Sequence, residues 1–233
     1  MSKILMVTTS HTRIPGTAAP TGVWYEELAA PYYAFVDAGH DVTLASIRGG
    51  AVPIDGRSLA ESPLPTSVRR FQDDPKALAA ARQSAPVAGL DPHAYDALFL
   101  PGGHGTMWDF PGNPALGGAI TVLLDAGRIV AAVCHGPAAF IDVLRPDGSP
   151  LVKGRSIACF TDSEERAVHL DDKVPFLLET KLRGLGAKVS VGPDFKPHVV
   201  VDGTLLTGQS PASSALLAEA VNTALMAGVP RRN

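Results

Sequence analysis

Residues 129–137 read Ile129-Val130-Ala131-Ala132-Val133-Cys134-His135-Gly136-Pro137, and this stretch decides how the chain is interpreted. An unbroken apolar run of this length is typical of a strand that is covered on both faces of a parallel sheet. The run ends at a cysteine, and the residues after it predict a helix. A nucleophile held at a sharp turn between a strand and a helix is the geometry of a nucleophile elbow.

Further short apolar runs along the chain, with helical patterns between them, predict an α/β fold. These predicted strands cover residues 4–8, 42–45, 97–100, 156–160, 188–191, 199–201 and 205–207. Helices are predicted over residues 22–38, 75–82, 114–126, 135–144, 174–185 and 211–227. The last helix has Ser210 as its N-cap and Pro211 at its first position, which is a good start signal.

The length and composition predict one large domain. The chain has 233 residues, 45% of them hydrophobic and 18% charged, which is enough to bury a sizeable core. Residues 48–94 interrupt the rhythm with Gly, Pro and Ser and only one short predicted helix, and a structureless loop of that length would be unusual. We therefore expect a single domain over residues 1–230. In it, residues 48–94 form a surface excursion that carries a small hairpin and covers one edge of the site.

Charge, cysteine content and hydropathy exclude several classes of protein. The net charge is −3 with no basic stripe, so a nucleic-acid partner is not expected. Two cysteines without a CxxC spacing form no disulfide framework, which predicts a reducing cytoplasm. No apolar run approaches the roughly 18 to 20 residues of a membrane span, so no membrane partner is expected. The sequence has no HExxH and no paired Cys/His spacing, and we expect no metal and no other cofactor.

In a parallel sheet, ligands bind beyond the carboxyl ends of the strands, so the residues after each apolar run are the candidates for a site. After residues 97–100 comes Pro101-Gly102-Gly103-His104-Gly105, whose glycines either point N–H groups at a ligand or serve only the turn. This turn matches neither a Walker loop nor a complete GxGxxG, so nucleotide binding is not predicted. After residues 156–160, Thr161-Asp162-Ser163-Glu164-Glu165 offers three carboxylates. Any one of them either orients a histidine or is simply favoured at a helix start.

The two cysteines and the first helix complete the list of candidates. Cys134 at the positive end of a helix favours a thiolate, and its alternative is a buried structural cysteine. Cys159 lies inside an apolar run and is expected to be inert core. In the first predicted helix, Pro31 has no N–H to donate to the carbonyl of Glu27, so we expect a kink that aims a carboxylate into the site. The alternative is that Glu26 and Glu27 are solvated acids of the first turn.

Taken together, Cys134-His135-Gly136-Pro137, Leu100-Pro101-Gly102-Gly103-His104-Gly105 and residues 21–31 resemble the DJ-1/PfpI superfamily, part of the class I glutamine amidotransferase-like fold. Within it, the chain is most similar to the heat-shock chaperone-like (Hsp31-like) class with glyoxalase III activity. The resemblance runs from about Lys3 to Ala227. It implies a three-layer sandwich with a flavodoxin-like, mostly parallel sheet, helices on both faces and a nucleophile elbow, assembled as a homodimer.

The resemblance also implies roles for individual residues. Cys134 becomes the nucleophile, His135 its neighbouring base and Glu165 the acidic third member of the site. Glu27 becomes the carboxylic acid that hydrogen-bonds the sulfur. The substrate-binding residues are Gly102, Gly103, His104 and His135, and the N–H groups of Gly103 and His135 form the oxyanion hole. Some relatives carry a metal-binding histidine in the first-helix segment, where this chain has Trp24, so no metal is implied here.

The activity that the resemblance implies is a glutathione-independent glyoxalase, a lyase of the glyoxalase III type. Such an enzyme converts methylglyoxal or a similar small 2-oxoaldehyde to a 2-hydroxy acid through a hemithioacetal on Cys134. A second enzyme reading, an amidase, peptidase or deglycase, uses the same nucleophile on a different substrate. A reading from another class is a stress-related holding chaperone or a redox sensor, in which Cys134 reacts with an oxidant.

Overall fold

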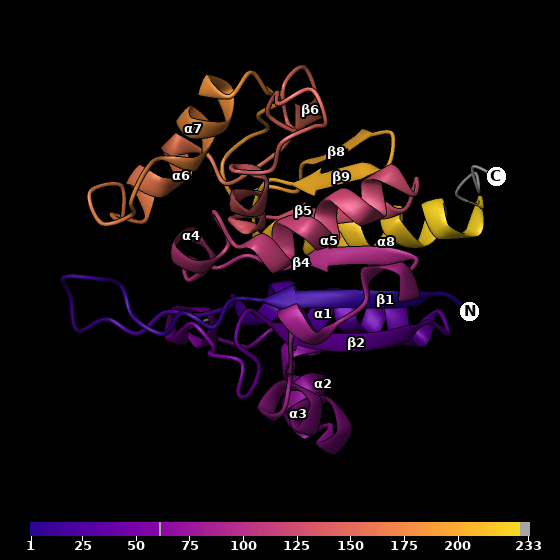
Figure 1. The fold of residues 1–233 in the computed structure, drawn as a ribbon. Coiled ribbons are helices and arrows are strands. Elements are labelled where there is room, and N and C mark those ends of the chain that lie inside the picture. The colour runs from indigo at the N-terminus through magenta and orange to yellow at the C-terminus, as the bar shows by residue number, and fades with distance from the viewer. Residues whose placement is uncertain (61, 229–233) are drawn as a thin grey trace.

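A seven-stranded, mostly parallel sheet forms the middle layer of the protein (Figure 1). The computed structural model describes residues 1–60 and 62–228. The strand order is β3-β2-β1-β4-β5-β9-β8, and every neighbouring pair is parallel except β8 with β9. The strands are β1 (Lys3–Thr8), β2 (Asp41–Ser46), β3 (Ala85–Pro86), β4 (Ala97–Leu100), β5 (Ile129–Val133), β8 (Val199–Asp202) and β9 (Leu205–Gly208). The predicted α/β fold with a flavodoxin-like sheet is confirmed.

Successive residues of the central strands pack into two separate cores, one on each face of this sheet. In β1, Leu5 and Val7 belong to the core that holds helix α5 (Pro114–Asp125). Ile4 and Met6 belong to the core that holds helices α1 (Tyr25–Asp37) and α8 (Ser214–Met226). Because both faces are buried, residues 4–7 of β1 and all of β4 and β5 are apolar at consecutive positions instead of alternating. This packing confirms the three-layer sandwich.

The excursion at residues 48–94 is more helical than predicted. It contains η1 (Gly56–Leu59), α2 (Thr66–Asp73), α3 (Pro75–Arg82), η2 (Val87–Gly89) and η3 (Pro92–Ala94), and β3 joins the sheet edge beside β2. The expected hairpin is absent from the described part of the excursion. Helix α2 was missed because only two of its residues, Val68 and Phe71, are buried, and Phe71 packs edge-on against the Tyr25 ring. The single domain over residues 1–230 stays a prediction, and residues 229 and 230 lie outside the described part.

Two predicted strands are much shorter than expected and lie outside the main sheet. Only β6 (Ser156–Ile157) and β7 (Lys188–Val189) are strands, and they pair with each other in a small parallel sheet. The N–H of Ala158 donates to the hydroxyl of Thr207, and the N–H of Phe160 donates to the carbonyl of Cys134. Residues 158–160 therefore take partners from side chains and turns, which an apolar pattern does not reveal.

The helix predicted over residues 135–144 is also wrong. The segment forms the short 3₁₀ helix η4 (Gly136–Phe140), in which Ala138 N–H donates to the carbonyl of His135. Pro137 lies in the first turn of this short helix, where the missing N–H costs no hydrogen bond. The tight turn keeps Cys134 and His135 close to the glycine turn that follows β4.

The other predicted helices are found with shifted ends. α3 has the predicted bounds, α5 ends one residue early, and α1 begins at Tyr25 and continues through Pro31. The last predicted helix is η5 (Pro211–Ser213) followed by α8, with Ser210 at the N-cap position. The helix predicted over residues 174–185 is α7 (Leu178–Gly184), which begins four residues late and ends one residue early. The remaining helices are α4 (Thr106–Asp109) and α6 (Asp162–Ala167). In the described part of the chain, no helix has the length and apolar character needed to cross a membrane.

Candidate active site

Cys134 sits at a strained turn directly after β5. Its φ is 60°, in the left-handed region that bulky residues rarely adopt, and the residue is 3% exposed. Its N–H donates to the Gly208 carbonyl at 2.9 Å, and its carbonyl accepts from Phe160 N–H at 2.8 Å. These bonds on both sides hold the strained conformation, as expected of a nucleophile elbow.

The turn after β4 approaches Cys134 so closely that only glycine fits. A Cβ on Gly102 would lie 2.6 Å from both His135 N and Val133 O, and a Cβ on Gly103 would lie 2.3 Å from the Gly22 carbonyl oxygen. The N–H of Gly102 donates to Glu27 Oε2 at 2.7 Å. The N–H of Gly103 hydrogen-bonds the Cys134 sulfur. The predicted glycine turn therefore contacts the nucleophile and the Glu27 carboxyl.

His135 joins the sulfur to Glu165. Its Nδ1 lies 3.2 Å from Cys134 Sγ, and its Nε2 lies 2.7 Å from Glu165 Oε2. Although burial opposes it, the charge of His135 and the hydrogen bonds from two histidines hold the pKa of Glu165 well below its ordinary value. An ionised Glu165 only accepts hydrogen bonds, so His135 carries its proton on Nε2. Its Nδ1 is then free to accept the thiol proton.

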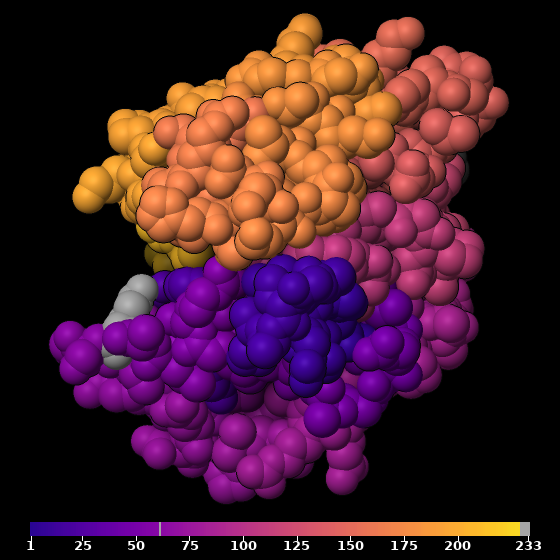
Figure 2. All heavy atoms as spheres, turned by 90° about the vertical axis from the view of Figure 1, so that its left-hand side faces the viewer, coloured from indigo at the N-terminus to yellow at the C-terminus, as the bar shows by residue number. Residues whose placement is uncertain are grey.

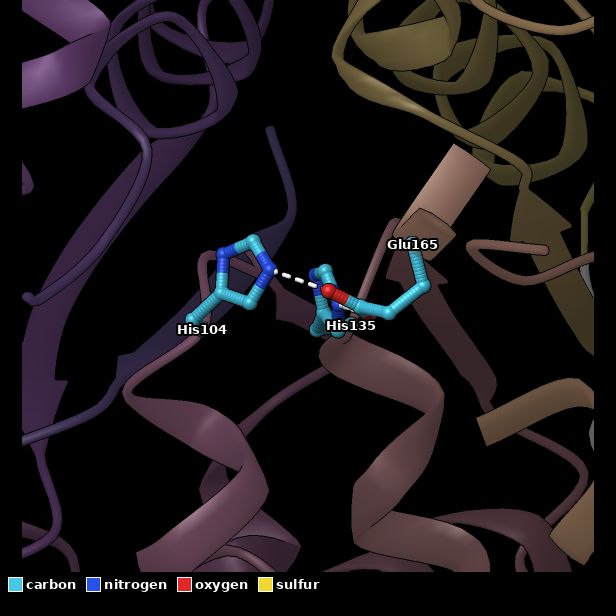
Figure 3. A group of neighbouring side chains, drawn as sticks. All are labelled: His104, His135 and Glu165. Carbon is cyan, nitrogen blue, oxygen red and sulfur yellow. Dashed lines mark hydrogen bonds and ion pairs between the residues drawn. The ribbon is translucent and has the colours of Figure 1, made fainter. Parts of the chain in front are cut away.

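His104 holds the other oxygen of Glu165, as Figure 3 shows. Its Nε2 lies 2.7 Å from Glu165 Oε1, and its Nδ1 lies 3.0 Å from Nη2 of Arg57. Burial and the charge of His135 lower the pKa of His104 to about 4, so the ring is neutral at physiological pH. Its tautomer is fixed as well, because Arg57 can only donate and Glu165 can only accept. The structure places His104 against Glu165, in addition to its predicted position in the glycine turn.

Arg57 and Asp55 extend this hydrogen-bonded chain into the excursion. Arg57 Nε donates to Asp55 Oδ1 at 2.9 Å and its Nη2 donates to Asp55 Oδ2 at 2.6 Å. Asp55 is fully buried and also accepts from the hydroxyl of Thr21 at 3.0 Å. Neither residue was predicted from the sequence, because no motif or periodicity marks residues 48–94. Residues 48–94 were predicted to cover one edge of the site, and Arg57 is the residue of this segment that lies beside His104.

Glu27 lies on the opposite side of the sulfur. It is fully buried, whereas its neighbour Glu26 is only partly buried and lines the cavity. Burial raises the pKa of Glu27 to about 8, although hydrogen bonds with Cys134 and with Gly102 N–H pull it down. Its Oε1 has no nitrogen or oxygen partner among the described residues. The carboxyl is therefore protonated at neutral pH and holds its proton beside the sulfur.

Burial also raises the pKa of Cys134, and the nearby Glu27 charge adds to this effect, while Gly103 N–H opposes it. The expectation of a thiolate stabilised by a helix is therefore wrong. The helix that follows has only five residues and is of the 3₁₀ type, so its dipole is too weak to outweigh desolvation. The resting group is therefore a thiol, and His135 Nδ1 lies 3.2 Å from its sulfur.

The neighbouring candidates are structural. Glu164 is the third residue of α6 and forms a capping box with Thr161. Its Oε1 accepts from Phe195 N–H at 2.7 Å and from Gln209 Nε2 at 3.1 Å. Cys159 is completely buried in the core that holds α5, as predicted. Of the two acids at residues 164 and 165, only Glu165 reaches a histidine.

A cavity of about 490 Å³ opens onto the sulfur. Its reactive side consists of Gly103, His104, Cys134 and His135. A second group of lining residues, which we name the apolar wall, consists of Trp24, Phe160, Val168, Phe195, Pro211 and Ala212. Glu26, Arg57 and Ser210 complete the lining. Figure 2 looks at the carboxyl ends of the parallel strands, where the orange segment of α6 and α7 meets the indigo N-terminal residues.

One cluster in the described part of the chain has the composition of a metal site. Ligand atoms of His104, His135 and Glu165 lie within 4.8 Å of one another. However, the Nε2 atoms of both histidines lie at hydrogen-bond distance from Glu165, one on each oxygen. A metal would have to displace both protons, so we describe the cluster as a hydrogen-bonding network.

Comparisons with known proteins identify relatives over most of the chain. Residues 18–224 match the model of the DJ-1/PfpI family. Glyoxalase 3 of Candida albicans is 31% identical over 230 residues, which is 95% of this chain and 97% of that protein. Glutathione-independent glyoxalase HSP31 of Saccharomyces cerevisiae is 33% identical over 225 residues, which is 91% of this chain and 93% of that protein.

Solved structures show the same fold. Rapid Encystment Protein 24 KDa of Francisella tularensis superposes with a TM-score of 0.93 at 34% identity, over 97% of this chain and 99% of that one. Glyoxalase III of Candida albicans superposes with a TM-score of 0.88 at 30% identity, over 96% of this chain and 97% of that one.

Proposed function

Because the chain belongs to the DJ-1/PfpI family, we propose that its buried cysteine site is that of a glutathione-independent glyoxalase. The observation that carries the proposal is the position of Cys134, between a protonated carboxyl, Glu27, and a histidine oriented by an ionised one, Glu165. Isomerising a 2-oxoaldehyde requires one group that gives a proton and one that takes it. Two carboxyls whose pKa values are pushed apart supply such roles.

The first step is addition of the Cys134 sulfur to the aldehyde carbon, which forms a hemithioacetal. His135 Nδ1 takes the thiol proton as the carbon–sulfur bond forms, and Glu165 stabilises the resulting imidazolium. The N–H groups of Gly103 and His135 stabilise the oxyanion until His135 returns the proton to it. Among the described residues, neither N–H donates to a backbone carbonyl. The Gly103 N–H hydrogen-bonds the Cys134 sulfur in the resting site, which places it beside the atom that attacks.

Proton transfers then convert the hemithioacetal to a thioester. His135 removes the carbon-bound proton while Glu27 gives its proton to the ketone oxygen, which yields an enediol. His135 delivers its proton to the second carbon, and the hydroxyl on the first carbon returns a proton to Glu27. The product is the thioester of a 2-hydroxy acid, and both groups are back in their starting states.

Hydrolysis of the thioester releases the product. His135 takes a proton from the attacking water and passes it to the departing sulfur. The net reaction adds one water to the 2-oxoaldehyde and gives the 2-hydroxy acid without glutathione. Methylglyoxal would yield lactate.

The test follows methylglyoxal loss and lactate formation without glutathione in the parent and in Cys134→Ala. We expect activity to fall to background in the variant, since no other cysteine lines the described cavity. Cys159→Ala is the matched control, because this second buried cysteine lies in the core away from the cavity. Full activity in Cys134→Ala would exclude the proposal.

The amidase, peptidase and deglycase reading uses the same nucleophile. Cys134 is only 3% exposed, which disfavours attack on the backbone of a peptide substrate. Turnover of amides but not of 2-oxoaldehydes would favour this alternative. The cytoplasmic location and the homodimer stay predictions.

A further inference from the structure

The apolar wall is much larger than a methyl group requires. Cavities of roughly 300 to 1,000 Å³ bury drug-sized ligands, and this one measures about 490 Å³. In the proposed reaction, the oxygens and the aldehyde carbon of the substrate are held by the reactive side of the cavity. The only part of methylglyoxal left for the apolar wall is its methyl group, which cannot fill it.

The aromatic part of the apolar wall runs from the His135 ring through Phe160 to the partly exposed Phe195. The Phe160 ring packs on the His135 ring with centroids 4.5 Å apart, and Phe195 follows at 6.2 Å from Phe160. A substituent that leaves the hemithioacetal carbon on this side would therefore meet apolar side chains, with Phe160 next to His135 and Phe195 next to Phe160.

Phe195, a residue of the apolar wall, has an unfavourable backbone conformation that a hydrogen bond to a buried carboxylate maintains. Its φ is 56°, an unfavourable conformation for a bulky residue, and its N–H donates to Glu164 Oε1 at 2.7 Å. The side chain nevertheless stays 44% exposed, so core packing does not explain its position. Strained residues of this kind cluster at ligand-binding sites.

The charges around the cavity disfavour an anionic substituent. Arg57 is the only cation that lines the described cavity, and its guanidinium is paired with Asp55 and bonded to His104. Glu26 lines the same cavity, and Glu165 lies behind the histidines. A carboxylate or phosphate on the substrate would meet more negative than positive charge.

We propose that this cavity selects 2-oxoaldehydes whose substituent is uncharged, apolar and larger than methyl, such as branched-alkyl or aryl glyoxals. The inference rests on the proposed glyoxalase function. Each methylene buried against the wall raises kcat/KM by about fourfold, the value expected for transfer of a CH₂ group out of water.

The experiment measures kcat/KM without glutathione for methylglyoxal, isobutylglyoxal and carboxyethylglyoxal. An alkyl probe is preferred because aryl glyoxals modify arginine side chains such as Arg57. The parent is expected to favour isobutylglyoxal over methylglyoxal by about tenfold or more. Carboxyethylglyoxal is expected to be the poorest substrate of the three.

Two variants test the wall from opposite directions. Phe195→Gly removes the ring and suits the positive φ, so it relieves strain and avoids a folding defect. Ala212→Phe fills the cavity. Both are expected to reduce the preference for isobutylglyoxal by about fivefold or more, the value of roughly one lost methylene or greater. Leu216→Ala, an exposed position on α8 outside the cavity, is expected to leave all three values unchanged.

A parent enzyme that prefers methylglyoxal, or a preference unchanged in both wall variants, overturns the inference and leaves the proposed function standing. The absence of Cys134-dependent turnover of every 2-oxoaldehyde would mean that the proposed function itself has failed.

Discussion

Glu27 and Glu165 are two buried carboxyls on opposite sides of the same histidine–cysteine pair, and they hold opposite charges. Glu27 lies in the first turn of α1, and Glu165 lies in the first turn of α6. They are 0% and 2% exposed, so burial hardly distinguishes them. Yet the pKa of Glu27 is raised to about 8 by burial, and the pKa of Glu165 is held well below its ordinary value.

The difference lies in the donors that each carboxyl faces. Glu165 receives an N–H from His104 on one oxygen and from His135 on the other, both at 2.7 Å. Glu27 receives one backbone N–H, from Gly102, and its carboxyl also hydrogen-bonds the Cys134 side chain. The charge of His135 and the hydrogen bonds of two histidines keep Glu165 ionised, whereas Glu27, beside a thiol and a backbone amide, keeps its proton. The presence of histidines, which can carry a positive charge, therefore distinguishes the two acids.

The largest expected effect is that of Glu165→Gln. The amide can accept from one histidine only and turns an NH₂ group toward the other, so His135 loses its fixed tautomer. Removing the carboxylate that orients a catalytic histidine costs about a thousandfold or more in kcat, and we expect a loss of that order here. Steady-state kinetics with methylglyoxal measures it.

Glu164→Gln is the matched control for that variant. This acid holds Phe195 and Gln209 and contacts neither histidine, so its loss should lower thermal stability and change kcat only a few-fold. If the two variants lose equal activity, the assignment of Glu165 is wrong.

Glu27→Gln should lower kcat by about a hundredfold, the contribution typical of a general acid, because the amide has no proton to give. In the parent, kcat should decline as the pH rises through about 8, where Glu27 ionises. The variant should be slower but should lack this alkaline decline. An unchanged decline would show that another group causes it.

Variants of His104 test the hydrogen bond that this residue gives to Glu165, and a smaller effect is expected. His104→Leu leaves Oε1 of Glu165 without its donor, so Glu165 binds the Nε2–H of His135 more strongly and His135 gives up the proton taken from the thiol less readily. We expect about a tenfold loss of kcat/KM at pH 7, the value of one lost hydrogen bond to a charged group. His104→Gln, which keeps an N–H near the same position, should recover most of this loss.

The smallest expected effect is on stability. The pKa of Glu27 is about 8 in the folded state and 4.5 as a free residue, so its contribution is fully present below pH 4.5 and is lost as the pH rises to 8. The pKa of His104 is about 4 against 6.5, so its contribution is present above pH 6.5 and is lost toward pH 4.

Between pH 6.5 and 8 only the Glu27 contribution changes, by at most about 2 kcal/mol, or a few degrees in Tm. Thermal melts of the parent should therefore show Tm falling over this window, and melts of Glu27→Gln should be flatter. A parallel fall in both proteins would contradict the protonation assigned to Glu27.

The sequence was sufficient to predict Cys134 because its signal is local: an apolar run, then a nucleophile, then a turn. It could not distinguish Glu27 from Glu26 or Glu165 from Glu164, since neighbouring acids have the same residue type and the same helix position. Only the resemblance made those choices. The predicted thiolate failed because burial, which the pattern does not show, outweighs the short helix.

The residues that were missed share a different cause. Arg57 meets His104 across 47 positions of the chain, and Asp55 meets Thr21 across 34. Residues 48–94 have no periodicity that would place them near the glycine turn. The strand predicted over residues 156–160 is shorter than expected for a related reason. The N–H of Ala158 donates to the Thr207 hydroxyl and the N–H of Phe160 donates to the Cys134 carbonyl, and neither partner is local in the sequence.

The hydrogen bonds that complete the site span 30, 47, 61 and 75 positions of the chain. None of them can form within a single local segment, so opening of the excursion removes the Arg57 donor from His104, and opening of the α6 region removes the Glu165 acceptor from both histidines. A locally opened molecule would therefore keep Cys134 but lose the groups that orient its neighbouring histidine.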